Sequence, residues 1–148
     1  MSIAEITKLS TAERHKLVSV PIDGQGLKTL LEAGMIWLKT NQQTVNSLNV
    51  FPVPDGDTGT NMVLTMQAAF DEISISGETN AGQLAHSIAR GALMGARGNS
   101  GVILSQIWRG FARALDEHPT MDVEILKEAL KEAEATAYKG CLLYTSPS

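Results

Sequence analysis

Apolar residues recur at intervals of three and four along most of this chain, which is the pattern of helices that bury one face. The first long stripe predicts a helix over residues 26–47, with Asp23 placed to cap its start. Because Trp37 lies on this stripe, we interpret it as a core side chain and not as part of a binding site. The stripe consists of Leu27, Leu30, Leu31, Gly34, Trp37, Leu38, Asn41, Val45 and Leu48.

Similar stripes predict further helices, separated by turn-forming residues, with Pro119 ahead of the last one. No regular alternation of strands with helices, of the kind that builds a parallel sheet, is visible. The predicted fold class is therefore all-α, an antiparallel bundle of amphipathic helices. The further helices are expected over residues 60–75, 81–95, 102–115 and 122–137.

The two ends of the chain differ from the helical middle. Residues 1–22 read as a polar leader, in which Ser10-Thr-Ala-Glu13 is a capping box for a short helix. Residues 23–139 carry the periodic pattern and form the expected domain. Residues 140–148 depart from that pattern, and we interpret them as a non-native tail, so Cys141 is given no functional weight.

Composition narrows the class of protein. The chain has 148 residues, enough for one domain with a real core, and a formal net charge of −4 with no basic patch, which disfavours a nucleic-acid partner. A single cysteine cannot form a disulfide framework or a cysteine-based zinc site. No apolar run has transmembrane length and no signal peptide is evident, so a cytoplasmic protein is expected.

Two carboxylates, Asp55 and Asp57, lie just before the second predicted helix, in the stretch Asn49-Val-Phe-Pro-Val-Pro-Asp-Gly-Asp-Thr-Gly-Thr-Asn-Met62. Carboxylates held this close repel one another, and a hard cation such as Mg²⁺ relieves the repulsion while keeping positions open for water and phosphate. The hydroxyls of Thr58 and Thr60, with the free N–H groups of this turn, could meet the same phosphates.

A simpler alternative is an aspartate-rich turn and helix cap, which a bare Asp-Gly-Asp would favour. Two familiar acidic sites do not fit. A calcium EF-hand loop starting at Asp55 would need an acid or amide at Gly59 and a glutamate at Met66. An aspartyl-phosphate site would follow a buried strand, which Pro52 and Pro54 oppose.

A second stretch, Gly91-Ala-Leu-Met-Gly-Ala-Arg-Gly-Asn-Ser-Gly101, precedes the fourth predicted helix. Each glycine weakens a helix by about 1 kcal/mol, so their density indicates a turn or a close approach. It is no P-loop, because no Gly-Lys-Ser/Thr follows. Considered alone, this glycine-rich stretch is explained equally well by tight helix packing and by phosphate binding. Considered together with the acidic loop, it favours a nucleotide site.

These two stretches, Leu48–Met62 and Gly91–Gln106, resemble the DhaL-type nucleotide-binding domain of dihydroxyacetone kinases. The match is closest to the N-terminal domain of the A subunit of bacterial fatty acid kinases and covers residues 23–138. The resemblance implies an antiparallel barrel of eight helices, of which this chain holds about the first five, as a C-terminally truncated fragment with exposed apolar stripes.

The resemblance also implies the site. Asp55 and Asp57 match two of three aspartates that hold two Mg²⁺ ions in the dihydroxyacetone kinase branch, and Asn49 stands near the third as a weaker metal ligand. No covalent catalytic residue is implied. The expected contacts to ATP or ADP are made by Thr58, Gly59, Thr60, Asn61, Gly98, Asn99, Ser100 and Gly101.

The implied function is an ATP- and Mg²⁺-binding domain of a kinase that transfers the γ-phosphoryl group to a fatty acid carboxylate. A fatty-acid-binding partner protein presents that acid, and a homodimer would form through domains that this chain lacks. The alternatives are an L-type dihydroxyacetone (glycerone) kinase subunit that keeps ADP–Mg²⁺ as a permanent phosphoryl relay, or a non-catalytic nucleotide-binding module.

Overall fold

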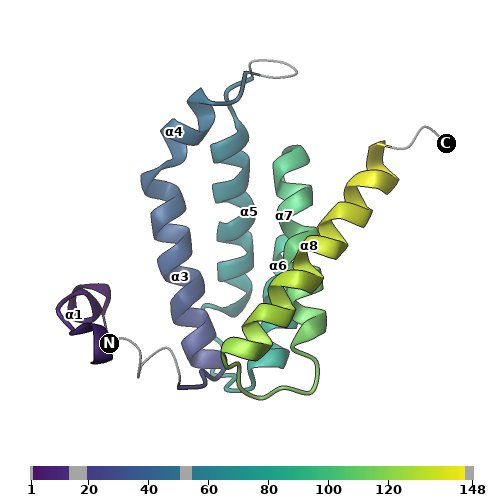
Figure 1. The fold of residues 1–148 in the computed structure, drawn as a ribbon. Helices are drawn as coiled ribbons and strands as arrows, with labels where there is room; N and C mark the ends of the chain where they lie inside the picture. Colours follow the sequence, from purple (N-terminus) through teal and green to yellow (C-terminus); the bar gives the residue numbers. More distant parts are fainter. Residues whose placement is uncertain (1, 14–19, 51–54, 146–148) are drawn as a thin grey trace.

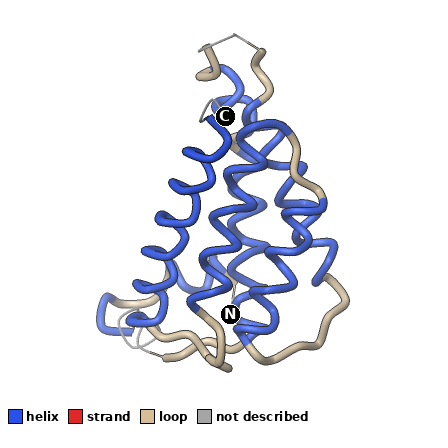
Figure 2. The backbone as a smooth tube through the Cα atoms, turned by 90° about the vertical axis from the view of Figure 1, so that its right-hand side faces the viewer, coloured by secondary structure: helices blue, strands red, loops and turns tan. Residues whose placement is uncertain are grey.

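The computed structural model describes residues 2–13, 20–50 and 55–145, and this part of the chain is helical (Figure 1). Its only β-type pairing is an isolated antiparallel bridge between Ile22 and Met121, and the tube of Figure 2 shows no strand in the described residues. The all-α prediction is therefore confirmed. The helices are α1 (Ile3–Thr7), α3 (Gly24–Thr40), α4 (Gln42–Ser47), α5 (Thr58–Ile73), α6 (Ala81–Met94), α7 (Gly98–Ala114) and α8 (Val123–Thr145).

The five longer helices alternate in direction. Helices α3, α6 and α8 begin at the lower end of Figure 1, whereas α5 and α7 begin at the upper end. The short helix α4 packs beside α5. Helices α5, α6, α7 and α8 pack in sequence, and α3 contacts α5 and α6. In the described part of the chain, none of these helices has the length and apolar character needed to cross a membrane.

The loops at the lower end are tied to one another by backbone hydrogen bonds. The N–H of Gly24 donates to the carbonyl of Thr79 at 2.7 Å, and the N–H of Met121 donates to Ile22 at 2.7 Å. The N–H of Ala81 donates to Pro119 at 2.9 Å. Because these bonds join three connections, the lower end is a closed base for the bundle.

The core lies among α3, α5, α6, α7 and α8 and is rich in small side chains. Its largest completely buried apolar residues are Ile73, Leu84, Ile88 and Leu115, and completely buried alanines lie among them. Alanine surfaces let helix axes approach closely, and such packing fixes the helices at native density. The fully buried alanines are Ala69, Ala81, Ala85, Ala92, Ala112 and Ala129.

Several local predictions are confirmed. Asp23 caps α3, because its Oδ1 accepts a hydrogen bond from the N–H of Gly26 at 3.0 Å. Ser10 and Glu13 form the expected capping box, with reciprocal bonds of 2.8 and 3.2 Å. The helices predicted over 60–75 and 81–95 correspond to α5 and α6 with small shifts at their ends.

The first long helix is broken where the apolar spacing predicted continuity. Asn41 separates α3 from α4, and its side-chain Nδ2 donates to the carbonyl of Trp37 at 2.9 Å. Its backbone N–H also donates to that carbonyl, at 3.1 Å, and to Leu38 at 3.2 Å. An asparagine that bonds the preceding turn in this way competes with the helical ladder and ends it.

The prediction of Trp37 as a core side chain was wrong, because 72% of its surface is exposed. Of the predicted stripe, only Leu27 and Leu31 are buried, and Met35, which the stripe did not include, is buried in line with them. Leu30, like Trp37, is exposed. The spacing identifies an apolar face but does not say how much of its width a neighbouring helix covers.

The last two helices also differ from the predicted bounds. α7 begins at Gly98, so Gly98–Gly101 form its first turn and are not a loop before it. α8 continues through Thr145, past the expected end at residue 137 and into the stretch interpreted as a tail. The origin of residues 140–148 stays a prediction.

An apolar groove of about 320 Å³ lies open between α3 and α8. Helices α5 and α7 form its floor. Apolar side chains are therefore exposed along this face, as Leu30 is. The groove is lined by Leu27, Leu30, Leu31, Gly34, Leu38, Met62, Met66, Leu104, Trp108, Phe111, Met121 and Leu126.

Two leucines of α6 offer a test of this core. Leu84 is completely buried, whereas 57% of Leu93 is exposed. We expect Leu84→Ala to lower the free energy of unfolding by about 2–5 kcal/mol, because it leaves a cavity among packed helices. Leu93→Ala should change it by less than about 0.5 kcal/mol. Urea titration of both variants measures the difference, and equal losses would contradict the assigned core.

Candidate functional site

The two carboxylates of the acidic motif are exposed at the start of α5. Gly56 between them has φ +66°, a left-handed conformation that glycine adopts without strain, so the chain turns sharply between the two acids. Asn49 Nδ2 donates to Asp57 Oδ1 at 3.3 Å. The structure thus brings two of the three predicted metal ligands together, while no hydrogen bond to another described residue holds Asp55. Pro52 and Pro54 lie outside the described residues.

Helix α4 holds the first turn of α5. The hydroxyl of Thr60 accepts hydrogen bonds from Gln42 Nε2 and from Asn46 Nδ2, both at 3.0 Å. The N–H of Thr60 donates to Asn46 Oδ1, also at 3.0 Å. Gly59 is buried, and a side chain there would collide with the carbonyl of Gln42. Sequence reasoning missed Gln42 and Asn46, because a single amide on a polar helix carries no distinctive signal.

These bonds correct part of the predicted phosphate site. The N–H of Thr60 is occupied by Asn46, and the N–H of Asn61 donates to the carbonyl of Asp57 at 2.8 Å. Neither is free for a phosphate. The Thr60 hydroxyl has both lone pairs engaged, but its proton remains, so it can still donate to an anionic oxygen in the one direction left open.

Helix α7 begins in a similar way. Gly98, its first residue, has φ +65°, and the first turn closes with the N–H of Gly101 donating to the carbonyl of Arg97 at 3.1 Å. The side chain of Asn99 is exposed. Ser100 Oγ donates to the carbonyl of Thr58, at 3.4 Å, which links the start of α7 to the start of α5.

The backbone N–H groups of these two first turns are left free. Thr58 and Gly59 on α5, and Gly98, Asn99 and Ser100 on α7, donate to no acceptor among the described residues. Free N–H groups and the positive ends of two helix dipoles therefore meet at the upper end of the bundle. This is the arrangement that receives phosphate groups at helix N-termini.

The long helices that begin at the other end are treated differently. Asp23, Asn80 and Asp122 cap α3, α6 and α8, and each accepts an N–H from the first turn of its helix at 2.9–3.0 Å. Asp57 and Arg97 occupy the same position on α5 and α7 without a side-chain cap. Asp57 is of a residue type that caps helices well, but its carboxylate accepts a hydrogen bond from Asn49 and none from the first turn of α5.

The glycines that precede α7 pack against α5. A side-chain carbon on Gly91 would lie 2.9 Å from the Cα of Ala69, and one on Gly95 would collide with the methyl group of Ala68. Gly98 in the same way faces the side chain of Asn61. The packing interpretation of this stretch is therefore correct, and the packing is what brings the two free helix starts together.

Thr65 lies one turn below, at the junction of the two helices. It is completely buried, its Oγ1 donates to the carbonyl of Asn61 at 2.8 Å, and it accepts the N–H of Arg97 at 3.1 Å. Gly101 packs directly on this hydroxyl. Sequence analysis did not select Thr65, because a threonine within an apolar stripe gives no signal of its own.

The donor set at the acidic turn suits Mg²⁺, since it consists of carboxylate and amide oxygens. In the described ranges, no three side chains of His, Cys, Asp or Glu converge on one point, so water and phosphate oxygens would have to complete the shell. For Asn49 to join the ligands, its amide must turn its oxygen toward the ion, which would replace its hydrogen bond to Asp57.

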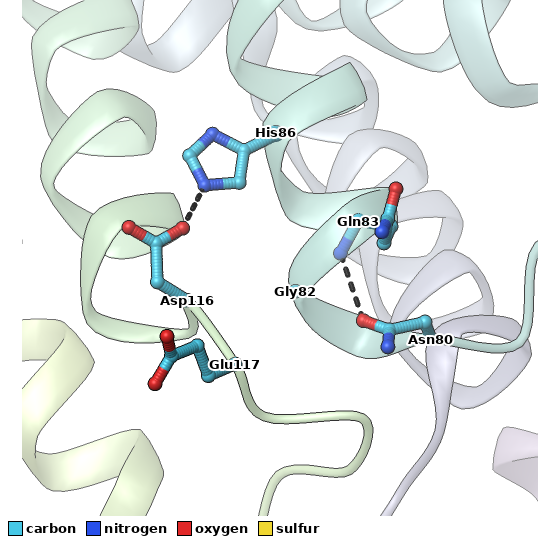
Figure 3. A pocket seen from close by; sticks show the side chains of 6 residues that line it. All are labelled: Asn80, Gly82, Gln83, His86, Asp116 and Glu117. Atoms are coloured by element: carbon cyan, nitrogen blue, oxygen red, sulfur yellow. Dashed lines mark hydrogen bonds and ion pairs between the residues drawn. The ribbon is translucent and has the colours of Figure 1, made fainter.

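A polar pocket of about 380 Å³ lies at the opposite end of the bundle (Figure 3). His86 Nε2 pairs with Asp116 Oδ1 across it, and Asn80 forms part of its wall. Both paired side chains are about half exposed. An exposed pair of this kind contributes little stability. None of the residues that line the pocket belongs to the acidic turn or to the first turns of α5 and α7.

Comparison with known proteins agrees with the motifs. The model of a family described as the DAK2 domain matches residues 52–141. Proteins of Staphylococcus aureus strains USA300, NCTC 8325 and COL, each described as uncharacterized, are 43% identical to this chain over 121 residues. These matches cover 82% of this chain and 22% of each relative, so the chain spans about a fifth of their length.

Gly56 and Gly98 both have a left-handed backbone, and substituting each one distinguishes the cost of backbone strain from the cost of lost packing space. Among the described residues, a side-chain carbon at Gly56 would meet nothing closer than the carbonyl of Asn46 at 3.9 Å, so Gly56→Ala should cost about 1 kcal/mol, from backbone strain. Gly98→Ala adds a collision with Asn61 to the same strain and should cost distinctly more. Urea unfolding of both variants measures the difference, and equal costs would show that α7 does not press on α5 at Gly98.

Proposed function

Because the chain belongs to the DAK2 domain family, we propose that it is the nucleotide-binding part of a phosphotransferase that binds ATP or ADP with Mg²⁺. One observation carries this proposal. The two long helices that start side by side beneath the acidic turn lack the side-chain caps present on the three that start at the other end. Free N–H groups and exposed carboxylates at one place suit a phosphate chain with its cation.

The proposed roles of the site residues follow from the charge that each group presents. Asp55 and Asp57, with Asn49 beside them, would hold Mg²⁺, which when bound neutralises the phosphate charge. The free N–H groups at Gly98, Asn99 and Ser100 donate to phosphate oxygens, as do those at Thr58 and Gly59. These contacts would position and neutralise a phosphoryl group, and phosphoryl transfer needs little else from the protein.

We propose a fatty acid as the phosphoryl acceptor, presented by a lipid-binding partner protein. A carboxylate oxygen attacks the γ-phosphorus, the bond to the bridging oxygen breaks, and ADP leaves with that electron pair, giving an acyl phosphate. The resemblance of Leu48–Met62 to the fatty acid kinase branch supports this choice of acceptor. Since the chain spans about a fifth of its S. aureus relatives, we assign acceptor recognition to other parts of a longer protein.

The dihydroxyacetone kinase branch is the alternative, because the DAK2 match covers both. The two differ in how long they keep the nucleotide. A kinase that uses free ATP releases ADP in each cycle, whereas a relay subunit retains it. We therefore expect a labelled ADP–Mg²⁺ complex of this protein to exchange completely with excess ATP during a desalting step. Retention of the label through that step would favour the relay function.

Substitution of one acid tests the nucleotide site. Asp57→Asn removes a charged metal ligand and keeps the shape, so the affinity for ATP in the presence of Mg²⁺ should fall more than tenfold, a loss above about 1.4 kcal/mol. Without Mg²⁺, the unaltered protein and the Asp57→Asn protein should have the same affinity for ATP. Isothermal titration calorimetry measures both conditions.

Asp71→Asn is the matched control. It makes the same change on the same helix, at an exposed acid that accepts a hydrogen bond from Gln67 at 2.8 Å. It should leave the affinity unchanged. An equal affinity for Mg²⁺–ATP in the Asp57→Asn protein and the unaltered one would contradict the metal assignment. A folded, unaltered chain that binds no nucleotide would contradict the proposed function of this segment.

A further inference from the structure

We propose that Thr65 is a positioning residue for the nucleotide site. Its hydroxyl sets the relative position of the two helix starts that supply N–H groups to the phosphates. This inference rests on the proposed function, but the junction itself is visible in the protein without a ligand.

The hydroxyl bonds both helices at once. It donates its single proton to the carbonyl of Asn61 in the first turns of α5, and it accepts the N–H of Arg97, the residue directly before α7. The donated bond, at 2.8 Å, fixes the direction of the lone pairs, and the accepted bond, at 3.1 Å, uses one of them. A single side chain therefore determines where α7 begins relative to α5.

No other described side chain replaces this bond. Arg97 has no side-chain cap of its own, and its N–H has no other acceptor in the part of the chain that the structure describes. Thr65 is completely buried, so water cannot take its place without a rearrangement. Loss of the hydroxyl would leave the Arg97 N–H unsatisfied and free the start of α7 to move.

The neighbouring glycines make the start of α7 sensitive to any change at Thr65. Gly98 packs on Asn61 and Gly101 packs on the Thr65 hydroxyl, so contacts three residues apart on α7 meet residues four apart on α5. Tight contacts at two levels leave little freedom to restore the geometry by sliding. A small displacement at Thr65 is therefore transmitted to the free N–H groups of Gly98, Asn99 and Ser100.

Three variants separate positioning from packing. Thr65→Val keeps the volume and removes both hydrogen bonds, whereas Thr65→Ser keeps the hydroxyl and removes a methyl group. Ser105→Ala is the control, because Ser105 is also buried but donates only within α7, to the carbonyl of Val102 at 2.6 Å. The full chain is used for each variant.

The first measurement is amide hydrogen exchange followed by NMR without nucleotide. In the Thr65→Val protein the Arg97 amide should exchange about tenfold faster or more, and it should change little in the other two variants. The second is calorimetric titration with ATP and Mg²⁺. Affinity should fall about fivefold or more for Thr65→Val and stay within about twofold for Thr65→Ser and Ser105→Ala.

The outcomes are distinguishable. If the unaltered protein binds Mg²⁺–ATP and the Thr65→Val protein binds it equally well, the role of Thr65 is wrong while the proposed function stands. If Thr65→Val and Ser105→Ala lower the affinity for Mg²⁺–ATP equally, and the two variants are equally stable, the effect of Thr65 is one of general packing. That result would also overturn the positioning role of Thr65. If the unaltered folded protein binds no nucleotide, the proposed function fails and the positioning role fails with it, whatever the exchange at Arg97 shows.

Discussion

The close approach of α5 to the segment that leads into α7 is the constraint on which this structure depends. Gly91, Gly95 and Gly98 all face α5, and a side-chain carbon at any of them would meet an atom of that helix. Glycine is unfavourable within helices, so this arrangement gives up intrinsic helix stability for proximity. The proximity places the starts of α5 and α7 side by side, with the acidic turn directly before α5.

The bundle has two unlike ends. At the lower end, backbone bonds such as that from Gly24 to Thr79 join the connections to one another, and side chains cap the helices. At the upper end, α4 is the main support of the first turn of α5, through Gln42 and Asn46. Rigid support below and free polar groups above is the usual division between a scaffold and the loops it carries.

The sequence predicted most of the fold and named most of the candidate site, for physical reasons that also mark its limits. Periodicity identifies a helix, so α5 was predicted to within two residues at each end and α6 to within one. Periodicity does not show how much of a helix face is covered by neighbouring helices, and Trp37 was therefore predicted in the core although it is exposed. Only the folded chain reveals that Asn46 occupies the Thr60 N–H, because the two residues lie on separate helices.

Asp57 precedes α5 but does not cap it, and this is the main physical reason to propose a binding role for the acidic turn. An aspartate before a helix ordinarily accepts an N–H of the first turn, and this bond is worth about 1 kcal/mol. Asp23 and Asp122 form it, and Asp57 does not. Arg97, at the start of α7, also leaves its helix uncapped. The starts of α5 and α7, which lie side by side, thus lack the stability that a side-chain cap would supply. A bound anion with its cation would restore that stability.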